Sequence, residues 1–207
     1  LQAGTAQAYT FSAKLEKPLM SRPYVAKEEN WGEQPVVRNK NKAGKKEMEL
    51  PPGYSFENWE APKDIYGRDQ LFEPTGIAVA KDGTVVVATR TAGIWRIRND
   101  KWTKFAEGTY ECLGVWIEDD KGDQFVVMQK PELTRMKDSN GDGRGDSFET
   151  VCDDYGFHGN YHEYAHGPVR DKEGNYYFSL NLSHGGNERT SWRAGGPFMG
   201  SMGGYRG

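Results

Sequence analysis

Hydrophobic and polar residues alternate in short stretches along most of the chain, and tight turns separate these stretches. Residues 76–79 lead through the turn Lys81-Asp82-Gly83, a strong hairpin signal, into the β-branched stretch 84–89. Residues 94–98 alternate apolar with polar side chains, and a further turn leads into 102–105. Four short strands joined by short turns within about thirty residues predict one blade of a β-propeller.

The same pattern recurs twice further along the chain. Strand-like stretches flank Gly122 and Gly174 as they flank Gly83, and these three turn glycines are spaced by 39 and 52 residues. Propeller blades repeat every ~40 to 50 residues. The longer second interval contains an acidic loop, which indicates an insertion with its own purpose. The recurring strand-like stretches are 113–117 with 124–128 and 166–169 with 176–180.

The expected fold is therefore all-β, an incomplete β-propeller of about three four-stranded blades over residues 51–207. Residues 1–50 show no steady period and are expected to form an extended N-terminal arm or linker, which Pro51-Pro52-Gly53 ends. Closed propellers have ~4 to 8 blades, and an open arc leaves strand edges unpaired. We therefore expect a remaining propeller segment or another chain to complete the ring.

Composition narrows the function. A net charge of −3 and a pI near 5.9 give no basic face for nucleic acid, and no apolar run reaches the ~18 residues of a membrane span. Ala6-Gln7-Ala8 has the small-x-small form of a signal-peptidase site, although an ordinary Ala-rich terminus looks the same. Cys112 and Cys152 could pair in an oxidising compartment or remain two buried thiols.

The acidic loop Asp138–Glu149 carries the sharpest chemical signal. It matches the twelve-residue calcium-loop template at positions 1, 3, 5, 6, 9 and 12. Calcium prefers six to eight hard oxygen ligands, and alternate residues of a tight loop can supply them. The flanking residues resemble strands rather than helices, so the loop would fasten a hairpin within a blade. The alternative is an acidic turn that binds nothing. The expected ligands are Asp138, Asn140, Asp142, the carbonyl of Arg144, Asp146 and a bidentate Glu149.

A second candidate site is the run of histidines His158, His162 and His166. Their spacing of four would suit a metal site on a helix, but Gly159 and Gly167-Pro168 favour a loop that leads into a strand. Such junctions can line the channel of a propeller, where a histidine with a near-neutral pKa can accept a substrate proton. We assign this role first to His162, against the alternative of a hydrogen-bonded structural histidine.

The stretch from Asn160 to Tyr177, with its Gly-Pro and acidic-Gly turn, resembles the glucose/sorbosone dehydrogenase-like propellers. The resemblance implies that His162 is the base that takes a sugar hydroxyl proton, with pyrroloquinoline quinone as the cofactor. Residues 51–207 are also similar to large secreted bacterial proteins in which such a propeller precedes a haem-binding c-type cytochrome domain. This implies a periplasmic or extracellular location. The chain departs from the pattern at Tyr161, where an acidic or amide residue is usual, and it has no Cys-x-x-Cys-His.

The expected function is thus a secreted or periplasmic, calcium-binding, quinone-dependent sugar or alcohol dehydrogenase. His162 would be the catalytic base, Asn160, Glu163 and Arg90 would line the same channel, and electrons would pass to a c-type cytochrome. The alternative is a non-enzymatic calcium-stabilised propeller that acts as a binding or assembly module.

Overall fold

The computed structural model describes residues 32–43, 46–155 and 164–181 of the 207-residue chain. Every regular element in these residues is a β-strand, which confirms the all-β prediction. The described residues contain no helix that is long and apolar enough to cross a membrane.

Sheet 1 contains the strands predicted for the first blade. Its strand order is β1-β9-β8-β7-β6, and all neighbours are antiparallel. Gly83, with φ of +90°, makes the turn between β6 and β7, and Asn99 and Asp100 both adopt positive φ between β8 and β9. The strands are β1 (Gln34–Pro35), β6 (Pro74–Val79), β7 (Val85–Thr89), β8 (Ile94–Arg98) and β9 (Lys101–Ala106).

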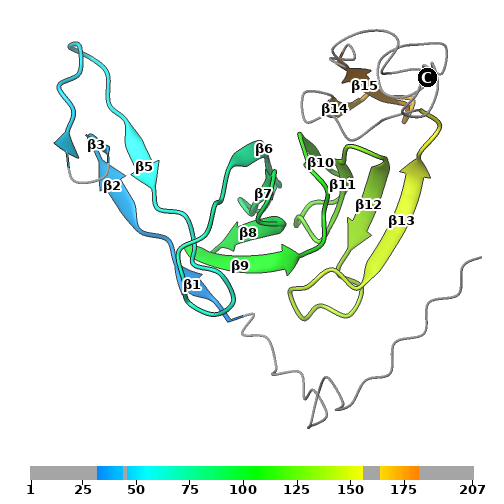
Figure 1. Cartoon of the computed structure of the whole chain (residues 1–207), viewed down its shortest axis with the longest axis horizontal. Helices are drawn as coiled ribbons and strands as arrows, with labels where there is room; N and C mark the ends of the chain where they lie inside the picture. The colour runs from blue at the N-terminus through cyan, green and yellow to red at the C-terminus, as the bar shows by residue number, and fades with distance from the viewer. Residues whose placement is uncertain (1–31, 44–45, 156–163, 182–207) are drawn as a thin grey trace, which may run out of the picture.

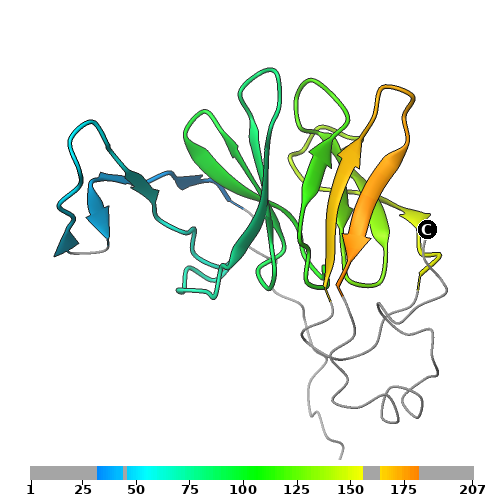
Figure 2. The same ribbon diagram turned by 90° about the horizontal axis from the view of Figure 1, so that it is seen from above.

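Two further sheets follow along the chain (Figures 1 and 2). Sheet 2 has the order β10-β11-β12-β13, and sheet 3 is the antiparallel pair β14-β15. The predicted strand stretches around Gly122 and Gly174 are confirmed. The strands are β10 (Val115–Ile117), β11 (Gln124–Met128), β12 (Leu133–Lys137), β13 (Ser147–Cys152), β14 (Ala165–Arg170) and β15 (Tyr176–Leu180).

A ribbon of short strands extends from the side of sheet 1, away from sheet 2 (Figures 1 and 2). In it β2 (Arg38–Lys40) pairs with β5 (Glu57–Trp59), and β3 (Lys42–Ala43) pairs with β4 (Lys46–Glu47). Strand pairing between β2 and β5 therefore crosses the expected domain boundary at residue 50, and β1 joins the outer edge of sheet 1. The described part of the predicted arm is built into the rest of the fold.

Each sheet packs its front face, the one toward the next sheet along the chain, against the rear face of that sheet. The first joint buries Val86, Ala88, Ile94 and Phe105 of sheet 1 against sheet 2, and the facing side chains of sheet 2 are Phe125, Val127 and Met136. The second joint packs the front face of sheet 2 against sheet 3, through Val126, Met128, Leu133, Tyr176, Phe178 and Leu180. Each buried side chain of this size stabilises the fold by roughly 1.5–3 kcal/mol.

Glycines allow the inner strands of the three sheets to approach each other closely. A Cβ added to Gly76 of β6 would lie 2.7 Å from Cα of Gly114, just before β10. A Cβ on Gly114, whose φ is +153°, would lie 1.7 Å from the carbonyl oxygen of Gly167 in β14. Backbone therefore meets backbone at both joints, and no larger side chain fits there.

Candidate metal centre and a second charged cluster

The acidic loop connects the last two strands of sheet 2, β12 and β13. The last cross-strand pair before it is Lys137 with Ser147, so residues 138–146 form the loop itself. The flanking strands β12 and β13 confirm the prediction of a hairpin instead of two helices. Five of the six predicted ligands lie at alternate positions within this loop: Asp138, Asn140, Asp142, Arg144 and Asp146.

Asp138 holds the loop in its turn. Its side chain is buried, and its two carboxylate oxygens accept hydrogen bonds from the backbone N–H groups of Gly141, at 2.7 Å, and Gly143, at 2.9 Å. Both glycines adopt positive φ, +81° and +93°, which lets the chain fold back around the carboxylate. Gly143 occupies position 6 of the calcium-loop template, where a glycine allows the sharp turn.

The other side chains of the loop form a series of local turns. Asn140 Oδ1 accepts a hydrogen bond from Asp142 N at 2.8 Å, and Asp142 Oδ1 accepts one from Arg144 N at 2.9 Å. Asp146 accepts hydrogen bonds from Ser139 N at 2.9 Å and Ser139 Oγ at 2.8 Å, and the first of these contributes most to lowering the pKa of Asp146. These contacts fold the loop and favour an ionised Asp146.

The loop also rests on sheet 1. Gly145 N donates a hydrogen bond to Phe105 O at 2.8 Å, and Arg96 Nη2 lies 3.6 Å from Asp138 Oδ2. The Arg96 and Asp138 side chains are each only 3% exposed, and Arg96 also pairs with Asp123 at 2.5 Å. Burial and the charge of Arg98 lower the pKa of Arg96, although the two carboxylates oppose this shift.

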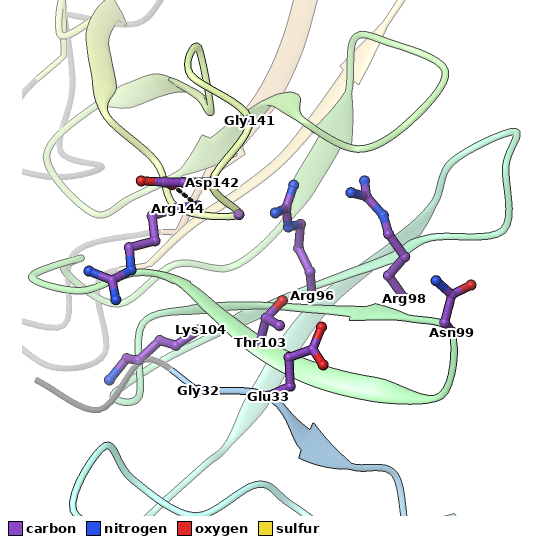
Figure 3. A pocket seen from close by; sticks show the side chains of 11 residues that line it. Gly32, Glu33, Arg96, Arg98, Asn99, Thr103, Lys104, Gly141, Asp142 and Arg144 are labelled. Carbon is purple, nitrogen blue, oxygen red and sulfur yellow. Dashed lines mark hydrogen bonds between the residues drawn. The ribbon is translucent and has the colours of Figure 1, made fainter.

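A polar cavity of about 290 Å³ borders the loop where it meets sheet 1 (Figure 3). In Figure 3, Arg96 points toward the loop backbone, and the side chains of Arg144 and Lys104 both lie to the left of Arg96. The loop contributes Asp142 and Arg144 to the lining, and β8 contributes Arg96 and Arg98. The rim of the loop is thus accessible from solvent, while Asp138 is buried at its base.

Glu149, the sixth predicted ligand, lies apart from the other five. It belongs to β13, is the cross-strand neighbour of Arg135, and accepts a hydrogen bond from Arg135 Nη1 at 2.7 Å. No group of three or more His, Cys, Asp or Glu side chains is close enough to hold a metal within the described ranges. A metal bound in the loop would need the Asn140 amide, the Arg144 carbonyl and water beside the carboxylates.

The histidine run is only partly described. His166 is on β14, exposed, with Nε2 3.1 Å from Asn181 Oδ1. His158, Asn160, His162 and Glu163 lie outside the described residues, so the catalytic role of His162 stays a prediction.

Arg90 belongs to a charged cluster at the ends of the inner strands, which we call the strand-start cluster (Glu73, Arg90, Glu111 and Lys130). Arg90 Nε lies 3.5 Å from Glu73 Oε2 and 3.6 Å from Glu111 Oε1, so it sits between two carboxylates from neighbouring sheets. Lys130 Nζ, whose side chain is 1% exposed, donates a hydrogen bond to Glu111 Oε2 at 3.0 Å. It also lies near the rings of Tyr110 and Tyr164.

The strand-start cluster has two unusual features. Arg90 Nε and Glu73 Oε2 are buried without a hydrogen-bond partner among the described residues, and Glu73 and Glu111 both adopt positive φ, +40° and +47°. A residue other than glycine in the left-handed backbone region costs of order 1–3 kcal/mol, and such residues are enriched at functional sites. Only Arg90 was singled out from the sequence. The repeated Glu-x-x-Gly of Glu73–Gly76 and Glu111–Gly114 is the sequence signal that could have identified the two glutamates.

The two cysteines are both free thiols in the structure, Cys112 buried and Cys152 half-buried. The sequence left open a disulfide or two separate thiols, and the structure has the two separate thiols.

Comparison with known proteins finds no family model, no curated protein and no solved structure that matches the chain. The assignment of function therefore rests on the geometry of the acidic loop and of the strand-start cluster.

Proposed function

We propose that this chain is part of a calcium-stabilised β-propeller in which sheets 1, 2 and 3 are successive blades. The identical register of the first two sheets supports the repeat. Ile77 pairs with Val87 on the rear face of sheet 1 as Val115 pairs with Val127 in sheet 2. The inner strands β6, β10 and β14 also follow one another through the Gly76, Gly114 and Gly167 approaches, as blades arranged around an axis would.

The calcium assignment is carried by one observation: five oxygen-bearing residues at alternate positions fill one nine-residue hairpin loop. Three of them, Asp138, Asp142 and Asp146, are carboxylates whose mutual repulsion a divalent cation would relieve. Calcium takes six to eight oxygens at about 2.3–2.6 Å, so five protein ligands leave room for water. The proposed set omits Glu149, because Arg135 already holds that carboxylate in the sheet.

Calcium in this loop would fasten two sheets together. The loop contacts sheet 1 through the hydrogen bond from Gly145 N to Phe105 O and the ion pair between Arg96 and Asp138. It also connects β12 and β13 of sheet 2. Arg96 neutralises part of the charge of Asp138, so the exposed Asp142 and Asp146 are expected to supply most of the negative charge that balances the cation. The function that follows is mechanical: the ion keeps the first two blades in register.

Isothermal titration of the calcium-free chain with CaCl₂ tests this proposal. We expect one site per chain, loss of binding in Asp142→Ala, and retained binding in the matched control Glu149→Gln. The proposal is wrong if the chain binds no calcium, or if Glu149→Gln abolishes binding and Asp142→Ala does not.

A second candidate function is the quinone-dependent sugar or alcohol dehydrogenase, and the strand-start cluster favours it. Arg90 Nε, which can donate a hydrogen bond, and Glu73 Oε2, which can accept one, have no hydrogen-bond partner among the described residues and could bind a hydroxyl group of an alcohol substrate. Tyr164, which neighbours Lys130, is two residues beyond His162 in the sequence. In this proposal His162 would take the hydroxyl proton, and pyrroloquinoline quinone, when bound, would supply the two-electron oxidation.

The described residues contribute no assigned contact to such a quinone, so the test must be made on activity. Dye reduction is measured with a panel of aldoses and alcohols after addition of calcium and pyrroloquinoline quinone. Turnover that His162→Ala abolishes and His166→Ala retains supports the dehydrogenase. No turnover with any substrate leaves the binding or assembly module as the function.

A further inference from the structure

The rear face of sheet 1 is apolar and open. Ile77 and Val79 on β6 are each 65% exposed, although they point to the same side of the sheet as Val85 and Val87. The corresponding face of sheet 2 is closed, because sheet 1 packs on it and leaves Phe125 and Val127 with no exposed surface. Exposure of two β-branched side chains side by side is costly for a soluble sheet.

The register shows that these two faces are equivalent. Val79 pairs with Val85 and Val85 with Ile97 in sheet 1. In sheet 2 the same positions are occupied by three hydrophobic residues that pack against sheet 1: Phe125 and Met136, which are buried, and Ile117, which is partly buried. The open face of sheet 1 therefore carries the residues with which this fold receives a preceding blade.

The projecting ribbon deepens this open face into a groove. Residues of β5 in the ribbon and of the rear face of sheet 1 line an apolar groove of about 680 Å³. The ribbon itself lies on the side of sheet 1 away from sheet 2 (Figure 1). Phe72 and Trp102, both buried, line the groove together with Trp59 of β5. Most of the large hydrophobic side chains exposed in the described residues gather in this part of the chain: Val37, Met48, Tyr54, Trp59, Tyr66, Leu71, Ile77 and Val79.

The opposite end of the described fold is open as well. In sheet 3, Arg170 and Tyr176 face sheet 2, because both reach Glu118. Their neighbours Val169 and Tyr177 form a cross-strand pair on the front face and are 56% and 55% exposed. One chain thus presents the receiving half of a blade joint at sheet 1 and the front face of a blade at sheet 3.

We propose that the groove on sheet 1 receives the front face of sheet 3 of a second copy of this chain, head to tail. The two joints already in the structure set this front-to-rear order. Two copies related by a twofold axis would each place the front face of sheet 3 against the open face of sheet 1 of the other copy. This inference rests on the proposed propeller arrangement.

Molar mass in solution tests the head-to-tail pairing. Sedimentation equilibrium of the chain in calcium should give twice the mass of the 23.3 kDa monomer. Ile77→Asp and Val169→Asp should each raise the dimer dissociation constant at least about tenfold, because each places an unpaired carboxylate in both joints. Phe148→Asp is the matched control: Phe148 is 54% exposed on the outer strand of sheet 2 and should leave the dimer intact.

A monomeric wild-type chain overturns the inference. So does loss of the dimer in Ile77→Asp alone, which indicates two sheet 1 faces packed on each other, or loss in Phe148→Asp, which indicates non-specific association. Calcium titration of the monomeric Ile77→Asp variant distinguishes failure of the dimer proposal from failure of the proposed calcium site. If this variant still binds calcium and no form of the chain dimerises, only the dimer proposal is rejected.

Discussion

Replacing Gly76 with alanine would place a methyl group between the inner strands of sheets 1 and 2. The new Cβ would lie 2.7 Å from Gly114 Cα and 3.0 Å from Gly114 C. These are backbone atoms that cannot rotate away, so the two strands would have to separate. Gly76 has no positive φ, so the substitution adds no backbone strain of its own.

The expected cost follows from two opposing effects. Overpacking a well-filled joint costs about 1–3 kcal/mol, with the upper end expected against backbone. Alanine also restricts the unfolded chain, which returns about 0.4–1 kcal/mol. We therefore expect the free energy of unfolding to fall by about 2 kcal/mol, which for a typical urea m-value lowers the unfolding midpoint by about 1 M.

Urea unfolding followed by tryptophan fluorescence measures this change, and Gly83→Ala is the matched control. Gly83 has φ of +90° and nothing within 4 Å of an added Cβ, so its alanine variant measures the backbone cost alone, about 1–2 kcal/mol. A Gly76→Ala chain as stable as the wild type would show that the inner strands do not pack backbone to backbone.

Two further predictions concern single titratable groups. Burial alone would raise the pKa of Glu118, but hydrogen bonds from Arg135, Tyr176 and Gln124 outweigh it and hold the pKa at about 2, below the ordinary 4.5. Its stabilising contribution is complete above pH 4.5 and is lost as the pH falls toward 2, so urea midpoints over this range should fall less in Glu118→Gln; equal slopes would refute the assignment. Burial raises the pKa of Cys112 to about 12, so iodoacetamide at neutral pH should modify Cys152 and spare Cys112 in the folded chain. Peptide mass spectrometry checks this, and equal labelling would contradict it.

The strands of the three sheets, apart from β1, could be predicted from the sequence because each carries its own signal. The alternation of apolar and polar residues on both sides of Gly83 and Gly122 predicts the strands and the turn between them from local sequence alone. The pairing of β2 with β5 could not be predicted in this way. Both strands are only three residues long and mostly polar, so neither shows a clear alternation of apolar and polar residues. The pairing also joins segments on either side of Pro51-Pro52-Gly53.

The spacing of oxygen-bearing residues identifies the candidate loop, but it does not predict the position of Glu149 correctly. Position 12 of the template assumes a helix after the loop, which would bring Glu149 back toward the ion. Here a strand follows, and its pairing with β12 sets Glu149 beside Arg135. Lys130 could not be predicted as part of the strand-start cluster, because an isolated charge carries no local signal and only the fold brings it to Glu111.

A crystal structure of the chain grown with calcium tests the central claim most directly. The anomalous difference map should show one ion in the 138–146 loop, with oxygens of Asp138, Asn140, Asp142, Asp146 and the Arg144 carbonyl within about 2.3–2.6 Å. Arg135 should still hold Glu149. A loop with its carboxylates apart and no ion at saturating calcium would contradict the account.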